Sequence, residues 1–434
     1  MAGKTLNIGL IGFGTIGTGV VKTIKKNKKS IKKRTGLDLN LKKIADTNLK
    51  RKREVNVDPD ILTQNADEII NDNDIDVVIE LIGGYNPAKE FILKALENKK
   101  YVVTANKALL SKHGREILNK AKENNVDVYF EASVGGGIPL LLPTGLSLGA
   151  NQIQSFYGIL NGTCNYILSK MEKENKSFEK ALKEAQDKGF AEADPTLDID
   201  GSDSMHKLVI LSSLAFGCFP DEENILLEGI QKITKKDIEY AKELGYKIKL
   251  LAIGKKKKKK VSLRVQPTLI PEDHLLSSVK NEMNAVFLRG DVVGDLMFYG
   301  KGAGMMPTAS AVVADLINVG QDILNKGVED VHLINLKNQG DLNVIGKDDF
   351  ESCYFLKFMV EDKVGLLSKL SKILSNNNVS IASISQKERK KNVPVFLTTH
   401  LPKEDMIKKS IREAKKLKGV KDVKMIRLNR FSEN

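Results

Sequence analysis

Short apolar runs alternate with longer stretches of helical periodicity over the first 150 residues. The first run lies at 5–11, and further runs follow at 37–46, 75–83, 101–106 and 126–133. Stretches with apolar residues three or four positions apart lie between them, as in helices with one buried face. Strands that alternate with helices in this way form βαβ units. We therefore predict an α/β domain with a doubly wound parallel sheet.

A glycine-rich segment lies between the first apolar run and the first helical stretch. It comprises Gly12, Phe13, Gly14, Thr15, Ile16 and Gly17. In this setting the first glycine permits a tight turn, the second lets a pyrophosphate approach, and the third lets the helix pack closely. The free N–H groups at the start of the helix attract phosphate. The segment predicts a Rossmann-type dinucleotide site; a structural turn without a ligand is the alternative.

Two features near the second predicted strand bear on the choice of dinucleotide. Asp46 ends that strand, where an acidic residue binds the ribose hydroxyls in NAD enzymes. Arg51 and Arg53 follow within reach and could hold a 2′-phosphate, so the residues leave NAD and NADP open. Ligands of such sheets lie beyond the carboxyl ends of the strands. We therefore expect Gly83 and Thr104 to line the same crevice.

The pattern changes after residue 150. Helices are predicted at 176–188, 202–217 and 234–246, and strands at 152–160, 261–269, 285–290 and 292–300. These elements predict an α+β domain at 151–304 for substrate binding and dimerisation, whereas residues 305–340 would complete the first domain at 1–150. Residues 351–434 are predicted to run strand, helix, strand, strand, helix, strand, the ferredoxin-like order.

Charge is unevenly distributed along the chain. The net charge is +14, with lysine-rich runs at 25–34 and 255–260. Nucleic-acid binding is one interpretation, but few aromatic residues lie among these lysines, so we favour a solvated surface and no nucleic-acid partner. The run at 255–260 precedes a predicted strand and is expected at a hairpin tip.

Residues 188–207 are acidic in spite of the basic chain. Asp200, Gly201 and Ser202 resemble the start of a helix, which places Asp203 and Lys207 one turn apart on one face. A surface ion pair is the structural interpretation. A site that binds an ammonium group is the functional one, because a buried ammonium needs carboxylate partners.

The composition indicates the setting of the chain. The three cysteines lie far apart and match no metal-binding spacing, which predicts a reducing, cytoplasmic location. No run of about 18 apolar residues occurs, so we expect no membrane span.

Six segments together resemble the homoserine dehydrogenase family. They read GLIGFGTIGTGV, TANKALL, EASVGGGIPL, NGTCNYIL, GFAEADPTLDIDGSD and GKGAGMMPTASAVVADL, in the family's order and spacing over residues 5–345. Residues 354–386 resemble an ACT regulatory domain. The resemblance implies interconversion of L-homoserine and L-aspartate 4-semialdehyde with NAD or NADP, with a slight preference for NADP. The reaction lies in the biosynthesis of threonine, methionine and isoleucine.

The resemblance also implies roles for individual residues. Lys207 would be the acid/base and Lys107 a second catalytic lysine that contacts the cofactor. Glu192 and Asp203 would bind the substrate, with Asp198 in the same acidic loop. Gly189 and Gly302 would lie toward the cofactor, and a sodium or similar ion would bind at Glu131, Val134, Gly136 and Ile138. A loop without an ion is the alternative for this last set.

The ACT resemblance implies an effector, most simply L-threonine, near Gly365 and Asn378, in a homodimer or homotetramer. Two departures from the family pattern are Cys164 in place of threonine and Lys363 in place of proline. A non-catalytic NAD(H)-sensing regulator is the alternative to an enzyme. The retention of Lys107, Glu192, Asp203 and Lys207 argues against it, since a sensor needs no proton donor.

Overall fold

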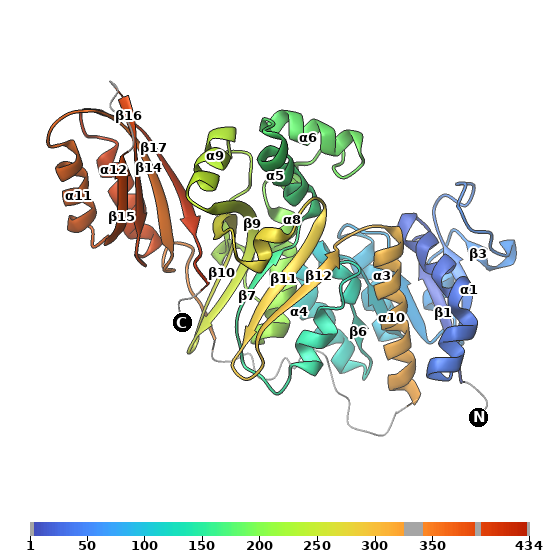
Figure 1. The fold of residues 1–434 in the computed structure, drawn as a ribbon. Helices are drawn as coiled ribbons and strands as arrows, with labels where there is room; N and C mark the ends of the chain where they lie inside the picture. Colours follow the sequence, from blue (N-terminus) through green and yellow to red (C-terminus); the bar gives the residue numbers. More distant parts are fainter. Residues whose placement is uncertain (1–3, 325–341, 387–391, 432–434) are drawn as a thin grey trace. The chain divides into compact units, whose positions relative to one another are not determined.

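The computed structural model describes residues 4–324, 342–386 and 392–431 (Figure 1). The chain forms two compact units. The first comprises residues 1–156, 206–220 and 282–341, and the second comprises 157–205, 221–281 and 342–434. Strand β7 (Ile153–Ile159) and helix α8 (Ser202–Phe216) have residues in both units. No helix of the described ranges is long and apolar enough to cross a membrane.

The first unit is built on a six-stranded parallel sheet in the order β3-β2-β1-β4-β5-β6. The strands are β1 (Lys4–Ile11), β2 (Leu37–Ala45), β3 (Leu62–Thr63), β4 (Val77–Glu80), β5 (Tyr101–Thr104) and β6 (Val128–Tyr129). The helices are α1 (Thr15–Thr35), α2 (Asp67–Ile70), α3 (Ala88–Glu97) and α4 (Lys107–Glu123), with a 3₁₀ turn η1 (Pro59–Ile61). The predicted doubly wound sheet is confirmed.

The central strands are mostly apolar, with a polar residue at the carboxyl ends of β4 and β5, because helices cover both faces of a parallel sheet. All four residues of β4 and all four of β5 are buried. The predicted strand at 126–133 is wrong beyond Tyr129, because Glu131–Ser133 form a 3₁₀ turn, η2. The turn places the Glu131 carboxylate against the backbone N–H groups of residues 140–142. An extended strand would direct this carboxylate elsewhere.

Helix α10 (Met305–Leu324) completes the first unit by packing along α1. A Cβ on Gly19 of α1 would come within 2.8 Å of Met305, so glycine permits this close contact. The predicted closing segment at 305–340 is thus a helix as far as Leu324, and its remainder lies outside the described residues. A π-helical turn, η3 (Pro143–Ser147), and the hairpin of β11 (Met283–Gly290) and β12 (Gly294–Lys301) also belong to this unit.

The second unit contains a helical part and a long hairpin. Its helices are α5 (Gly162–Glu174), α6 (Phe178–Asp187), α7 (Thr196–Ile199) and α9 (Lys235–Glu243), with 3₁₀ turns η4 (Glu222–Asn224) and η5 (Leu275–Ser278). The hairpin pairs β9 (Tyr246–Lys257) with β10 (Lys260–Pro271), and the short strands β8 (Leu226–Leu227) and β13 (Asn343–Val344) also pair with β10. Lys258 has a φ of 58° at the tip, so the lysine run turns the hairpin as predicted.

The C-terminal part of the second unit has the predicted βαββαβ order. Its elements are β14 (Cys353–Glu361), α11 (Leu366–Asn376), β15 (Ile381–Gln386), β16 (Asn392–Thr399), α12 (Glu404–Ala414) and β17 (Val420–Leu428). The strands are ordered β17-β14-β16-β15 and pair antiparallel. At the far edge β17 pairs in parallel with β10 through residues 427 and 428 (Figure 1). The C-terminal sheet therefore continues into the sheet of the hairpin.

Candidate active site

The glycine-rich turn joins β1 to α1 with the geometry of a phosphate site. Gly12 has a φ of 103°, which favours glycine, and its N–H donates to the Ala45 carbonyl (2.9 Å). A Cβ on Gly17 would lie 2.2 Å from the Gly12 carbonyl oxygen, whereas a Cβ on Gly14 would meet no atom within 4 Å. Gly17 is thus needed for packing, and Gly14 leaves open space beside the start of α1. No side chain caps this end of α1, and its first turn has no acidic residue.

Asp46 and Arg53 hold this turn from the side of β2. The Phe13 N–H donates to the Asp46 carboxylate (2.7 Å), and the Arg53 Nε donates to the Phe13 carbonyl (2.7 Å). The Arg53 guanidinium also donates to the carbonyls of three residues of the following loop and lies 4.4 Å from the centre of the Phe13 ring. Arg53 is therefore engaged in fixing the turn, while the nearby Arg51 is exposed.

A buried carboxylate organises the carboxyl ends of β4 and β5. Glu80 accepts hydrogen bonds from the N–H groups of Ile82 and Gly83 and from the Thr104 hydroxyl (2.7 Å). Asn106 donates to the Gly84 carbonyl and caps α4 by accepting from the Leu109 N–H. The candidate residues Gly83 and Thr104 are thus held in one network. Lys107, half-buried, is the first residue of α4.

Sequence reasoning did not select Glu80, and it gave Asn106 no role of its own at the crevice. The signal for Asn106 was present, since asparagine before a helical stretch is a strong N-cap. A buried glutamate within an apolar run carries no such local signal.

Asn161 connects two carboxylates of the acidic segment. Its side-chain amide donates to Asp198 (2.7 Å) and to Asp203 (2.8 Å), and its oxygen accepts from the Cys164 N–H at the start of α5. Asn161 is 5% exposed and Asp203 is 6% exposed. The structure therefore brings together Asp198 and Asp203, through an asparagine that sequence reasoning did not select. Its position before α5 in NGTCNYIL, typical of an N-cap, was the available signal.

The N-terminal turn of α8 bears both Asp203 and Lys207. The helix begins at Ser202 as predicted, and the Ser202 N–H donates to the Asp200 carboxylate (2.8 Å). Asp203 and Lys207 lie one turn apart and are both buried; Lys207 is 8% exposed. Because both side chains are withdrawn from solvent, Asp203 and Lys207 do not form the surface ion pair of the structural interpretation.

The other candidates of the acidic segment are exposed. Glu192 is exposed, and Gln186 donates to its backbone carbonyl (3.2 Å). Asp194 accepts from the hydroxyl and N–H of Thr196, so it shapes the turn at Pro195. Gly189, with a φ of 73°, lies just after the end of α6, and its N–H donates to the Gln186 carbonyl (2.9 Å). The structure does not bring the Glu192 carboxylate into contact with Asp198 or Asp203.

The Glu131 loop contains a carboxylate surrounded by backbone amides. Its two oxygens accept from the N–H groups of Leu140, Leu141 and Leu142, at 2.5 to 2.8 Å. The Glu131 N–H donates to Asp315 of α10 (2.9 Å). Burial raises the pKa of Asp315 well above its usual range, and the nearby Glu131 charge adds to this shift.

Backbone oxygens of the same loop remain available as ligands. Among the described residues, no N–H donates to the carbonyls of Val134, Gly136 or Ile138. A Cβ on Gly136 would lie 2.4 Å from the Gly302 carbonyl oxygen, so Gly136 and Gly302 meet backbone to backbone. Carbonyl and carboxylate oxygens suit a hard cation. No cluster of three or more histidine, cysteine or acidic side chains fit for a metal occurs within the described ranges.

The predicted effector residues lie on exposed loops of the C-terminal part. Gly365 has a φ of 83° and precedes α11, and Asn378, with a φ of 55°, lies just after its end. Lys363 and Lys421 both pair with Glu361 (2.6 and 2.7 Å), and these lysines lower the pKa of Glu361 to about 2. Val364, beside Gly365, is fully exposed.

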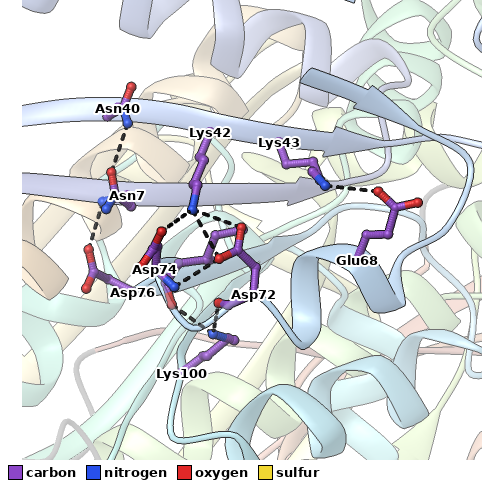
Figure 2. Close-up of polar contacts among 10 residues, drawn as sticks. Asn7, Asn40, Lys42, Lys43, Glu68, Asp72, Asp74, Asp76 and Lys100 are labelled. Carbon is purple, nitrogen blue, oxygen red and sulfur yellow. Dashed lines mark hydrogen bonds and ion pairs between the residues drawn. The ribbon is translucent and has the colours of Figure 1, made fainter. Parts of the chain in front are cut away.

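A charged cluster lies at the opposite, amino-terminal end of the parallel sheet (Figure 2). Lys42 pairs with Asp72 (3.0 Å) and Asp74 (2.8 Å), and Lys100 donates to the carbonyls of Asp72 and Ile75. Burial lowers the pKa of Lys100. These charges satisfy one another and the backbone, which indicates a structural cluster.

Comparison with known proteins identifies the family. Homoserine dehydrogenase models match residues 12–131 (NAD binding domain) and 139–317, and an ACT domain model matches 354–419. Homoserine dehydrogenase of Bacillus subtilis (strain 168) is 42% identical over 97% of this chain and 97% of its own. The crystal structure of a homoserine dehydrogenase from Thiobacillus denitrificans, 40% identical, covers 99% of both chains with a TM-score of 0.94.

A more distant structure is that of a hyperthermophilic archaeal homoserine dehydrogenase in complex with NADPH. It is 26% identical, covers 74% of this chain and 98% of its own, and has a TM-score of 0.62. The matches run from the glycine-rich turn through the C-terminal domain, and the predicted enzyme, fold and ACT domain are confirmed. The chain belongs to the homoserine dehydrogenase family.

Proposed function

We propose that this dehydrogenase oxidises L-homoserine to L-aspartate 4-semialdehyde, and reduces it back, with Lys207 as the proton acceptor and donor. The observation that carries this assignment is the start of α8, where Asp203 and Lys207 lie one turn apart and are both buried. Asp203 and Glu192 bind the substrate ammonium, and Asn161 orients Asp203 by its hydrogen bond. Asp198, fixed by the same amide, orders the acidic loop.

The proton and the hydride leave the substrate at adjacent atoms. Neutral Lys207 takes the hydroxyl proton as the C4–H bond breaks, and in the reverse direction the lysine ammonium protonates the aldehyde oxygen. When bound, the nicotinamide supplies or accepts the hydride. Lys107, at the start of α4, contacts the substrate or the nicotinamide end. The non-catalytic sensor is not favoured, because the relatives that match nearly the whole chain are homoserine dehydrogenases.

The open space beside Gly14, at the uncapped start of α1, would hold the pyrophosphate of the dinucleotide. We propose that both NAD and NADP are accepted, with a slight preference for NADP. The Arg51 side chain is exposed and can bind a 2′-phosphate, whereas the Arg53 side chain donates to the Phe13 carbonyl of the turn. The archaeal relative solved with NADPH supports this choice. Phe13, Thr15, Ile16, Gly83, Thr104, Gly189 and Gly302 complete the expected contacts.

A monovalent cation such as sodium is proposed at the Glu131 loop. The carbonyls of Val134, Gly136 and Ile138, together with the Glu131 carboxylate, form a donor set of oxygens. Such an ion has a structural task, since it would tie this loop to the neighbouring backbone at Gly302. Exchange of sodium for choline at constant ionic strength should lower the melting temperature if an ion binds there.

We also propose regulation by L-threonine through the ACT domain, and a place in threonine, methionine and isoleucine biosynthesis. The positive φ of Gly365 opens α11, whose first N–H groups can receive a carboxylate. Asn378 lies at the other end of the same helix, so its amide would hold an effector bound across a subunit interface. Threonine should inhibit the full chain and release or absorb heat on titration. Full activity and no heat at millimolar threonine would assign the domain to another ligand or to assembly.

The central test is a spectrophotometric assay of homoserine oxidation with NAD⁺ and NADP⁺ in parallel. Lys207→Met should lower kcat by roughly 10²- to 10⁴-fold, the usual loss for a general acid or base. Lys173→Met, at an exposed position of α5, is the matched control and should leave kcat unchanged. Near-normal turnover of a folded Lys207→Met protein would remove Lys207 from the chemistry.

The acidic residues require a separate measurement. Glu192→Gln should raise KM for homoserine more than it changes kcat, since an ammonium contact exists before and during the reaction. An unchanged KM would make Glu192 a surface residue without a substrate contact.

A further inference from the structure

Arg264, in the middle of β10, is a buried charge with two nitrogen atoms that have no hydrogen-bond partner among the described residues. Its side chain is 2% exposed, and its Nε and Nη1 atoms reach no hydrogen-bond partner within the described residues. The guanidinium carbon lies 4.2 Å from the centre of the Phe350 ring, which covers one face. Burial lowers the pKa of Arg264 to about 10, so the group stays charged at neutral pH. Buried charges in proteins are paired, and an exception calls for a missing ion or water.

A second buried arginine, Arg427, differs from Arg264 because its guanidinium is paired with carboxylates. Arg427 of β17 donates from Nε and Nη2 to Glu404 and from Nη1 to Glu228 (2.6 Å). Glu404 also accepts from the Tyr354 hydroxyl and pairs with Lys408. Both acidic groups are therefore committed to Arg427 and its neighbours. Arg427 acts on Arg264 only by repulsion, which adds to the need for negative charge.

A small cavity opens at Arg264. It has a volume of about 10 Å³ and is lined by Arg264, Gln266 and Lys255 from the hairpin, and by Ser352, Asn429 and Arg430 from the C-terminal part. Three of these side chains are basic, and no carboxylate lines the cavity within the described residues. The Asn429 side-chain nitrogen is also buried without an acceptor. The Gln266 side-chain oxygen, in the same lining, is a buried acceptor without a donor among the described residues, so the unpartnered donors of Arg264 and Asn429 outnumber it.

We propose that this cavity binds one small monovalent anion of chloride size. The volume admits about one water-sized group, so a larger anion such as phosphate does not fit inside. A water molecule would accept a hydrogen bond but would leave the charge of Arg264 uncompensated. The ion would receive hydrogen bonds from Arg264 and from the Asn429 amide.

The position of the cavity gives the ion a task. Its walls come from β9 and β10 on one side and from the two ends of the C-terminal domain, beside β14 and β17, on the other. At this place β17 pairs with β10 through two residue pairs only, Thr268 with Arg427 and Leu269 with Leu428 (Figure 1). A bound anion would neutralise repulsion at this short junction. Chloride should thus strengthen the attachment of the regulatory domain to the hairpin.

The first test compares the melting temperature of the full chain in sodium chloride and in sodium gluconate at equal ionic strength. Above the dissociation constant, each tenfold rise in chloride should raise the melting temperature by a constant step, as for any ligand of the native state. Gluconate, too large for the cavity, should give no such step. Arg264→Met should abolish the difference between the salts, whereas Arg412→Met, at an exposed position of α12, should preserve it.

The second test does not depend on a variant that folds. Crystals of the unaltered chain grown in sodium bromide should show an anomalous peak beside the Arg264 guanidinium. Absence of the peak, or density for water or for a carboxylate of the chain in its place, would overturn the proposal. Equal melting temperatures in chloride and gluconate would do the same.

Discussion

The two ends of the parallel sheet in the first unit differ in the kind of polar group that they carry. The carboxyl end has glycines, backbone N–H groups and the buried Glu80, which organises loops by accepting hydrogen bonds. The amino end has lysines and aspartates that pair with one another (Figure 2). The carboxyl end leaves space and hydrogen-bond donors for a ligand. At the amino end the opposite charges pair with one another. Charge density by itself therefore does not indicate a site; unfilled hydrogen-bonding capacity does.

The largest expected effect belongs to Gly17→Ala at the carboxyl end. The new Cβ would lie 2.2 Å from the Gly12 carbonyl oxygen, and backbone atoms would have to move. Overpacking of this kind destabilises by about 1–3 kcal/mol or more. Chemical denaturation should show the loss of stability, and KM for the dinucleotide should rise in the same protein. Wild-type stability would mean that α1 can shift without affecting the turn.

Gly14→Ala should separate binding from folding in the same turn. A Cβ there meets no protein atom within 4 Å, so the free energy of unfolding should be unchanged. A pyrophosphate beside Gly14 would be displaced, with the loss of a charge-assisted hydrogen bond of about 1.5–3 kcal/mol, or tenfold or more in the dinucleotide dissociation constant. Fluorescence titration with NADPH measures it. Unaltered affinity would place the pyrophosphate elsewhere.

Lys100→Met should give the reverse result at the amino end. Lys100 is 4% exposed, and its removal leaves the carbonyls of Asp72 and Ile75 without their donor. We expect a loss of about 1–3 kcal/mol in unfolding free energy, with no change in dinucleotide affinity. Lys94→Met, at a largely exposed position, is the control and should be nearly neutral. A weakened affinity in Lys100→Met would break the distinction between the two ends.

Asp72→Asn should give the smallest effect, visible in the pH dependence. The Asp74 N–H and then Lys42 lower the pKa of Asp72 in the folded protein. A lowered folded pKa contributes stability above the unfolded pKa, and this contribution disappears as the pH falls through the folded value. The variant should therefore lose less stability than the wild type between neutral pH and about pH 3. Parallel acid titrations, followed by circular dichroism, would refute this assignment if their slopes agree.

The pattern of the chain predicts the parallel sheet of the first unit because each βαβ unit leaves a local signal. The glycine turn, the start of α8 and the hairpin at Lys258 are fixed by neighbouring residues, and all three were predicted. Glu80 and Asn161 were not selected, because their contacts with Thr104 and with Asp203 join positions far apart in sequence. Strand β9 was missed as well, since its apolar residues run into the lysine segment. Arg264 was not selected either, because only the three-dimensional structure shows that two of its nitrogen atoms lack a hydrogen-bond partner among the described residues.

The packing of α1 against α10 has a consequence for how the protein is made. Helix α1 is synthesised before its partner α10, which follows only after the entire middle of the chain. Until then the surface of α1 around Gly19 faces water instead of Met305 and Ala309. Contacts between such distant segments form slowly, and apolar surface left uncovered during synthesis attracts chaperones and aggregation. A nascent chain that stops before α10 already contains all six strands of the parallel sheet. Its nucleotide-binding unit should nevertheless be incomplete, because α1 lacks its packing partner.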